Sequence, residues 1–347
     1  MSHGLFHRYE ANPILQADDW PYPVNAVFNP GATEFNGDTL LLVRVEDRSG
    51  LSHLTVARSE DGFRNWRIDE RPTFTPDLKS YEEAWGIEDP RITRLKDGTY
   101  MIVYTGYSLG GPLVCLASTT DFESFQRHGV LMTPEDKDSA LFPDQFDERW
   151  ALIHRPASPG AHAFGAHMWV SFSPDLRHWG DHRVLLPARR GGYWDANKVG
   201  LSPPPMRTEY GWLLCFHGVK TTPAGALYRL GLAMVDLNDP SLLKIRSSEW
   251  VFGPDTPYER TGDVQDVVFP CGWILEGDGN TIRMYYGASD TSVAVAVGNL
   301  DQLLEHLHKT CVCGRKHQLG DACEVAATAP LVSSRFRGQF SSAEKAP

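Results

Sequence analysis

Residues 97–107 read DGTYMIVYTGY: a tight-turn signal, a run of strand-forming residues and a polar, aromatic end. An Asp-Gly turn next to residues of high strand propensity is typical of a β-hairpin strand. A turn followed by such a strand recurs four times, in GDTLLLVRVEDR (37–48), DERWALIHRP (147–156), YGWLLCFHGV (210–219) and GNTIRMYYGASD (279–290). The chain therefore carries one strand unit in five copies.

A second series of short strands interleaves with the first. Each member is an alternating strand followed by a polar turn, and three of these turns carry a Ser/Thr-x-Asp signal; the series covers residues 55–66, 115–125, 169–179, 232–240 and 295–303. Successive units lie about 50 to 70 residues apart, which fits one four-stranded propeller blade with its loops. The repeats predict an all-β fold, a five-bladed β-propeller, with a short helix only from residue 301. A β-sandwich with coincidentally similar hairpins is the alternative.

The composition argues against two classes of partner. The 347 residues are 41% hydrophobic and 22% charged, and the formal net charge is −11. An acidic chain is a poor binder of nucleic-acid phosphates, although a small local cationic pocket is compatible with it. No run approaches the ~18 apolar residues of a membrane span, and the first residues lack the apolar core of a signal peptide. We therefore expect a cytoplasmic protein that binds neither nucleic acid nor membrane.

The repeats assign residues 1–307 to a single propeller catalytic domain and residues 308–347 to a C-terminal tail, which we expect to be partly disordered. The segment CVCGRKHQLGDAC holds four potential zinc ligands, Cys311, Cys313, His317 and Cys323. Their spacing is not one of the common zinc motifs. Incidental thiols are the favoured interpretation, and we predict no metal site.

Polar and aromatic residues gather at the ends of the first-series strands. A propeller places its innermost strands around a central channel, where residues from all blades converge. If the first series is innermost, these residues share one site: Arg44, Glu46, Asp47, Arg48, Tyr104, Tyr107, His154, Arg155, His217, Tyr285, Tyr286 and Asp290. Arg, His, Tyr and Asp at equivalent points of five blades indicate a pocket for a polar ligand.

Seven motifs in order resemble glycoside hydrolase family 130, which contains β-mannoside phosphorylases on a five-bladed propeller. They are FNPGA (28–32), RVEDR (44–48), GIEDPRIT (86–93), HRP (154–156), NKVG (197–200), VVFPCG (267–272) and YYGASDT (285–291). Each motif alone is a weak signal, and the resemblance runs from about residue 25 to about residue 297. It implies phosphorolysis, in which phosphate is the nucleophile and a carboxylic acid protonates the departing oxygen.

The resemblance points to Asp89 as the general acid. It also implies an inverting reaction, in which this acid can pass its proton through a sugar hydroxyl. Pro90 should push Asp89 toward extended backbone and so restrict the direction of the carboxyl group. To stay protonated at neutral pH, Asp89 needs a raised pKa. Adjacent Glu88 is expected on the opposite face of the strand. In the structural alternative, Asp89 pairs with Arg91 in a turn.

The remaining site residues divide by ligand. Candidates for phosphate are Arg44, Arg155, Lys198 and His217, because cationic groups make charge-assisted hydrogen bonds to phosphate; Arg155 and Lys198 match the family pattern best. Candidates for the sugar are Asn29, Asp47, Arg48, Tyr107 and Asp290, with Trp85 and Tyr228 as further aromatic surfaces. No cofactor is expected beyond inorganic phosphate as co-substrate.

We therefore expect an inverting β-mannoside phosphorylase that reversibly converts a β-mannosyl disaccharide or oligosaccharide and phosphate to α-mannose 1-phosphate and a shortened sugar. A hydrolase on the same fold would need a second carboxylate to activate water, and Asp47, Asp263, Asp266 and Asp290 are available. A non-catalytic carbohydrate-binding propeller is the alternative from another class. An arabinan- or fructan-cleaving enzyme would need no cationic set. Flat propeller faces and the habit of the family are compatible with a homo-oligomer.

Overall fold

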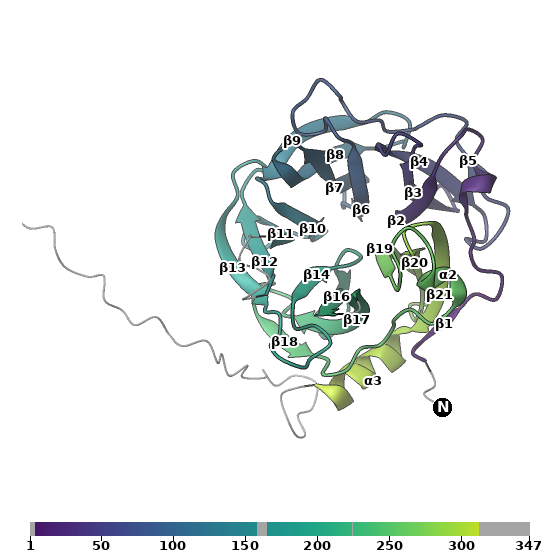
Figure 1. Ribbon diagram of the computed structural model, residues 1–347. Coiled ribbons are helices and arrows are strands. Elements are labelled where there is room, and N and C mark those ends of the chain that lie inside the picture. The colour runs from purple at the N-terminus through teal and green to yellow at the C-terminus, as the bar shows by residue number, and fades with distance from the viewer. Residues whose placement is uncertain (1–3, 158–164, 224, 312–347) are drawn as a thin grey trace, which may run out of the picture.

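A computed structural model describes residues 4–157, 165–223 and 225–311. Five antiparallel sheets stand around a common axis as the blades of a propeller (Figure 1). Each blade has four strands in one continuous order, and the fourth blade carries the extra short strand β15 (Met206–Arg207) on β16. The predicted all-β, five-bladed propeller is therefore confirmed.

The strands of each blade run from the axis outward. The innermost strands are β2 (Ala26–Phe35), β6 (Ile87–Arg94), β10 (Asp136–Leu141), β14 (Lys198–Leu201) and β19 (Val268–Leu275). The second strands are β3 (Asp38–Glu46), β7 (Tyr100–Ser108), β11 (Trp150–Pro156), β16 (Trp212–Thr222) and β20 (Thr281–Ala288). The third strands are β4 (Ser52–Ser59), β8 (Gly111–Thr119), β12 (Met168–Ser173), β17 (Gly225–Val235) and β21 (Ser292–Asn299). The outermost strands are β5 (Arg67–Ile68), β9 (Gln126–Met132), β13 (Gly180–Leu186), β18 (Leu243–Arg246) and β1 (Phe6–Arg8).

The first series forms the second strand of each blade, so its predicted innermost position is wrong. The strand that precedes it in each blade lies on the axis, and bulges and prolines hide that strand's alternation in the sequence. Three of the polar strand ends consequently bind inside the protein wall. The hydroxyl groups of Tyr104 and Tyr286 donate to Glu83 at 2.6 Å and to Glu259 at 2.8 Å, and that of Tyr285 donates to a main-chain carbonyl at 3.0 Å.

The hydrophobic core lies between the blades. Within the described residues, one buried cluster fills each of the five boundaries between neighbouring sheets. The boundary of the first two blades, for example, buries Leu40 and Leu54 against Ile87 and Ile102. Because each face of a sheet packs on a neighbouring sheet, the apolar residues stay in the wall and the axis is left to polar side chains.

The Ser/Thr-x-Asp signals form the same turn after the third strand of three blades. One carboxylate oxygen of Asp61 accepts the backbone N–H groups of Phe63 and Arg64, both at 2.8 Å. Asp121 and Asp175 accept two backbone N–H groups in the same way. These backbone donors lower the pKa of all three carboxyl groups. The repeat in the sequence is therefore a repeated turn with a common mechanism.

The N-terminal strand closes the ring. β1 pairs with β21, so that the last blade is built from both ends of the described chain. The Arg8 guanidinium donates to both oxygens of Glu259, at 2.7 and 2.9 Å, and to the Gly253 carbonyl at 2.7 Å. Glu259 lies in the short helix α2 (Pro257–Arg260), and its side chain is fully buried. This ion pair joins the closing strand to the segment that leads into β19.

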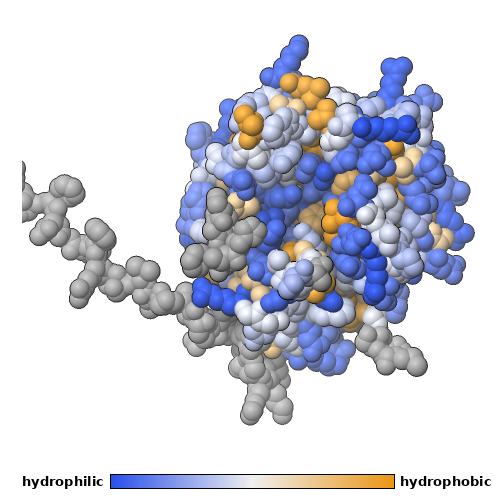
Figure 2. Space-filling model, viewed as in Figure 1, coloured by the Kyte–Doolittle hydropathy of each residue, from blue (hydrophilic) through white to orange (hydrophobic). Residues whose placement is uncertain are grey.

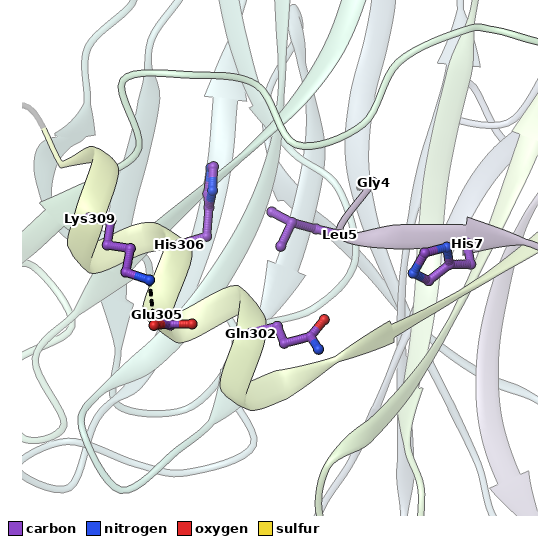
Figure 3. A pocket seen from close by; sticks show the side chains of 7 residues that line it. All are labelled: Gly4, Leu5, His7, Gln302, Glu305, His306 and Lys309. Atoms are coloured by element: carbon purple, nitrogen blue, oxygen red, sulfur yellow. Dashed lines mark hydrogen bonds and ion pairs between the residues drawn. The ribbon is translucent and has the colours of Figure 1, made fainter. Parts of the chain in front are cut away.

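A C-terminal helix, α3 (Leu300–Thr310), covers the outer rim beside β1 (Figure 1). The Asn299 side chain caps it by accepting from the Gln302 N–H, and Leu303 and Leu307 are fully buried under it. A surface pocket of about 490 Å³ separates the start of β1 from α3, with His7 and His306 on its walls (Figure 3). No described helix is long and apolar enough to cross a membrane.

The tail interpretation falls mostly outside this description. Cys311 is a half-buried free thiol at the end of α3. Residues 312–347, with the candidate ligands Cys313, His317 and Cys323, lie outside the described residues. The partly disordered tail and the absence of a metal site in it therefore remain predictions.

Replacing Arg8 with Met should weaken ring closure. The change leaves the buried Glu259 carboxylate without its cation, and breaking a buried ion pair in this way costs about 3 kcal/mol of unfolding free energy. Chemical denaturation monitored by circular dichroism measures the loss. The control is Arg67→Met, which removes a 57% exposed guanidinium from its surface pairs and should cost less than about 1 kcal/mol. Equal losses in the two variants would contradict a special role for the closing pair.

Candidate active site

Three innermost strands bulge at equivalent positions, and each bulge presents a buried polar residue. The pairing register shifts between Phe28 and Gly31 in β2, between Glu88 and Arg91 in β6, and between Lys137 and Ala140 in β10. The residues within the bulges are Asn29, Asp89 and Asp138, with φ of 45°, 50° and 56°. Asn and Asp tolerate this left-handed conformation better than other non-glycine residues. The expected extended backbone at Asp89 is therefore wrong, because the bulge overrides the preference set by Pro90.

Asp89 is 3% exposed and lies at the centre of a polar network. One carboxylate oxygen accepts from the Asn29 side-chain amide at 2.9 Å and from Arg44 Nη1 at 3.1 Å. Arg44 also donates from Nη2 to Glu88 at 3.0 Å. The prediction that Glu88 faces away from Asp89 is thus wrong, since the bulge lets two adjacent carboxylates meet one guanidinium. Arg91 donates to the Asp89 main-chain carbonyl and not to its carboxylate, which contradicts the structural pairing alternative.

The pKa of Asp89 is lowered, opposite to the predicted direction. Burial alone would raise it, but the cations of Arg44, Lys137 and Arg91 outweigh burial. Asp290 behaves in the other way. Burial raises the pKa of Asp290 to about 6, and the nearby Arg44 opposes this only in part. Asp89 is therefore held as a carboxylate, whereas the nearby Asp290 carboxyl group has a pKa of about 6.

A second group of charges surrounds Asp138. Arg155 Nε donates to one oxygen of Asp138 at 2.6 Å, and His217 Nε2 lies 3.2 Å from the same oxygen. These partners hold the pKa of Asp138 well below its usual value despite burial. Lys198 lies close enough to Arg155 and Lys137 for their charges, together with burial, to lower the pKa of its ammonium. The structure thus brings Arg155, Lys198 and His217 together.

Lys137 and Asp138 were not predicted from the sequence. Burial lowers the pKa of Lys137, but the carboxylates of Glu88, Asp138 and Asp89 raise it more, so this lysine stays an ammonium ion. Among the described residues, neither Lys137 nor Lys198 makes a side-chain hydrogen bond or ion pair. A signal was available in the repeat: FNPGA (28–32), EDPRI (88–92) and KDSAL (137–141) all place Asn or Asp at the second position.

We call this group the channel cluster: Asn29, Arg44, Glu88, Asp89, Arg91, Lys137, Asp138, Arg155, Lys198, His217 and Asp290. The cluster contains five arginines and lysines but only four carboxylates, although the net charge of the whole chain is −11. Hydrophilic residues gather around the hollow at the centre of the ring (Figure 2). Cationic groups in this number beside a buried carboxyl group are of the kind that makes charge-assisted hydrogen bonds to an anion.

Three predicted sugar-binding residues have no contact with the channel cluster among the residues that the structure describes. Asp47 accepts the backbone N–H groups of Ser49 and Leu51 and so closes the turn after β3, and Arg48 is exposed beside it. Tyr107 is 38% exposed and packs edge-on against Trp85, with ring centroids 5.7 Å apart. Their roles stay predictions. Tyr228 lies nearer, with its ring centroid 6.2 Å from that of His217.

A hydrogen-bond chain through the third blade supports Arg155. One oxygen of Asp136 accepts the Arg155 backbone N–H at 3.1 Å, and the other lies 2.6 Å from His154 Nδ1. His154 Nε2 then meets Ser171 Oγ at 2.7 Å, and Ser171 Oγ meets His182 Nδ1 at 2.6 Å. Ser171 is fully buried, so this Asp-His-Ser arrangement is a support and not a nucleophile. His154, predicted to line the channel, instead belongs to this hydrogen-bond chain inside the third blade.

Comparisons with known proteins point to one family of glycoside-active enzymes. A family model described as β-1,4-mannooligosaccharide phosphorylase matches residues 8–309. The β-1,4-mannooligosaccharide phosphorylase of Ruminococcus albus is 32% identical over 86% of this chain and 90% of that protein. The β-1,2-mannobiose phosphorylase of Listeria innocua, solved with β-1,2-mannobiose, superposes with a TM-score of 0.80 at 31% identity over 88% of this chain and 99% of that one.

A further solved structure comes from work on glycoside hydrolases of the GH130 family of mannoside phosphorylases that target β-1,2 mannosidic linkages in Candida mannan. It is 25% identical, with a TM-score of 0.74 over 85% of this chain and 93% of that one. The relatives of this chain therefore include both reaction types.

Asp290→Asn should stabilise the protein at neutral pH and not in acid. A carboxyl group whose folded pKa is about 6, above the ordinary 3.8, favours the folded state only while it is protonated, so its contribution is lost as the pH rises from 3.8 through 6. Removing its charge should therefore add about 2 kcal/mol of unfolding free energy at pH 7.5 relative to pH 4. Denaturant unfolding at both pH values measures the difference. The exposed Asp18→Asn is the control, and an equal effect at both pH values would contradict the prediction.

Proposed function

The chain belongs to glycoside hydrolase family 130 and is therefore an enzyme that acts on glycosides; from this premise we propose that it is an inverting β-mannoside phosphorylase. The reaction is the reversible phosphorolysis of a β-mannosyl disaccharide or oligosaccharide to α-mannose 1-phosphate and a shortened acceptor sugar. The observation that carries the proposal is the gathering of Lys137, Lys198 and Arg155 near the buried Asp89; within the described residues, neither lysine makes a side-chain hydrogen bond or ion pair. A phosphorylase must hold phosphate in this way, whereas a hydrolase has no use for it.

Each group has a role in this reaction. Lys137, Arg155, Lys198 and His217 hold the phosphate dianion, and the phosphate oxygen attacks the anomeric carbon as the glycosidic bond breaks. Asp89 supplies the proton to the departing oxygen, directly or through a sugar hydroxyl. Asn29 and Arg44 fix its carboxyl group at 2.9 and 3.1 Å. No catalytic base is needed, because phosphate is already an anion.

Phosphate also changes the protonation of the acid. In the unliganded site Lys137 is one of the cations that hold the pKa of Asp89 low. A bound dianion neutralises such cations and adds negative charge, and both effects raise the pKa of a nearby carboxyl group. Asp89 is therefore expected to gain its proton when phosphate binds, so that the acid is ready only in the complex.

Hydrolysis is the second candidate, favoured by one observation. Asp290 is a half-buried carboxyl group with a pKa of about 6, within electrostatic range of Asp89, as a base that activates water would be. Of the other carboxylates considered for this role, Asp263 accepts from Asn25 at 3.1 Å in an exposed pair, and Asp266 is half-buried. The gathered cationic groups of Lys137, Lys198 and Arg155 favour phosphorolysis over hydrolysis.

The deciding experiment measures sugar release from β-1,4-mannobiose, β-1,2-mannobiose and β-mannosyl-N-acetylglucosamine, with and without inorganic phosphate, followed by ³¹P NMR. We expect α-mannose 1-phosphate only when phosphate is present. Asp89→Asn should abolish turnover and leave binding of the disaccharide, measured by calorimetry, largely intact. Free mannose at the same rate without phosphate would make the protein a hydrolase. Binding without any turnover would favour the carbohydrate-binding alternative.

Lys198→Ala should raise the KM for phosphate by about 10- to 100-fold, since a hydrogen bond to a charged group contributes roughly 1.5–3 kcal/mol. The KM for the mannoside should change far less, because this lysine contacts only the anion. Steady-state kinetics with each substrate varied in turn separates the two effects. Lys220→Ala is the matched control, since Lys220 is a half-buried lysine whose ammonium donates to the Gly191 carbonyl. Equal rises in both KM values would count against a phosphate role for Lys198.

A further inference from the structure

Arg91 is among the largest fully buried side chains of the protein, with 1% of its surface exposed. Its guanidinium donates three hydrogen bonds, all to main-chain carbonyls. Nε donates to Ser202 at 2.8 Å, Nη1 to Asp89 at 3.1 Å and Nη2 to Leu201 at 3.1 Å. Its nearest carboxylate oxygen belongs to Asp138, 3.8 Å away. A buried cation satisfied by carbonyl groups contributes a fixed shape as well as a charge.

The three acceptors lie in two blades, the second and the fourth, which are not adjacent in the ring. Arg91 and Asp89 belong to β6 of the second blade, whereas Leu201 is the last residue of β14 of the fourth blade and Ser202 directly follows it. The guanidinium also lies 5.7 Å from the ring of Phe269, in β19 of the fifth blade. With Asp138 in β10 of the third blade, one side chain contacts four of the five blades. Arg91 therefore spans the channel rather than lining one wall.

We propose that Arg91 is a positioning residue for the acid: it acts as a strut across the channel that fixes the Asp89 main chain and so aims the Asp89 carboxyl group. Asp89 has a φ of 50° ahead of a proline, a conformation that its surroundings must enforce. The bond from Nη1 to the Asp89 carbonyl fixes the peptide plane on one side of that residue. The other two bonds anchor the strut to the opposite wall.

The wall of the first blade supports the same segment from outside. A Cβ atom added to Gly31 would lie 2.7 Å from the Pro90 carbonyl oxygen, so β2 and β6 are in close backbone contact at this point. Arg91 thus holds the Asp89–Pro90 peptide, and Gly31 lies against the Pro90–Arg91 peptide that follows it. Lysine cannot replace the strut, because one ammonium cannot reach three carbonyl groups that match a planar fork.

Charge and shape are separable in the test. The groups that face Asp89 are Arg44 from β3, Lys137 from β10, Glu88 from its own strand, Asp290 after β20 and the neutral Asn29 from β2. Asp138, also from β10, lies 3.8 Å from Arg91. Arg91→Lys keeps the charge and removes the fork. Arg91→Met removes both, and loss of a cation should raise the pKa of Asp89 and move the pH limit of activity set by its ionisation upward.

The activity test rests on the proposed function. We expect Arg91→Lys to lower kcat about 100-fold, as a small misplacement of a catalytic group does, with both KM values within about threefold and the pH profile unmoved. Arg91→Met should lose as much and shift the profile. The control is Arg283→Lys, a 7% exposed arginine in β20 that donates to Thr39, Tyr285 and a main-chain carbonyl. If folded Arg91→Lys keeps the kcat of the wild type, or loses no more than the control, the proposal is overturned.

A second measurement does not depend on the reaction. In a crystal structure of Arg91→Lys we expect the Asp89 carboxylate to leave its contacts with Asn29 and Arg44. An Asp89 unchanged in φ and in both contacts would overturn the strut even if the enzyme is inactive. A wild-type protein that cleaves no mannoside would instead contradict the proposed function and leave this structural outcome to decide the role of Arg91.

Discussion

The bulge at Asp89 is the constraint on which the site depends. In a regular strand, adjacent side chains point to opposite faces, so only one of Glu88 and Asp89 could face the channel. The bulge removes this alternation, and both carboxylates meet Arg44. Equivalent bulges bring Asn29 and Asp138 to the same depth from the neighbouring blades. Three local backbone irregularities, repeated with the blades, therefore build one polar centre from segments far apart in the sequence.

Charge balance inside this centre explains why its residues are interdependent. A buried ion needs partners, because desolvation otherwise drives it to its neutral form. Asp138 satisfies Arg155 and His217 with a single oxygen, and Arg44 satisfies Glu88 and Asp89. Among the described residues, Lys137 and Lys198 make no such ion pair, and the nearby carboxylates, Asp138 among them, act on both ammonium groups at longer range.

The fold could be predicted from the sequence because its signals are local. Turns such as Asp61 and strands such as residues 100–108 are determined by neighbouring residues, and their fivefold repetition gives the architecture. The position of each strand in its blade was misjudged, since the innermost strands are short or bulged and lack clear alternation. Asp89, Arg155, Lys198 and His217 were found through motifs, and the structure brings them together.

Lys137, Asp138 and the direction of the Asp89 pKa could not be found in this way. Asp138 follows a lysine in a polar segment that resembles a loop, and its place beside Arg155 depends on register across a bulge. The pKa of Asp89 is a sum of burial and several charges from three strands, and no motif contains those distances. Asp47, from the RVEDR motif, accepts backbone N–H groups in the turn after β3, which its place in the motif did not predict.

Ring closure by β1 also has a consequence for the order of folding. The strand Phe6–Arg8 precedes all the others in the chain, yet its partner β21 begins at residue 292. During synthesis on the ribosome, β1 therefore remains without its partner until nearly all of the propeller has been made. Contacts between such distant segments are costly in loop entropy and slow to form. The ion pair of Arg8 with Glu259 is thus expected to be among the last native contacts that the newly made chain acquires.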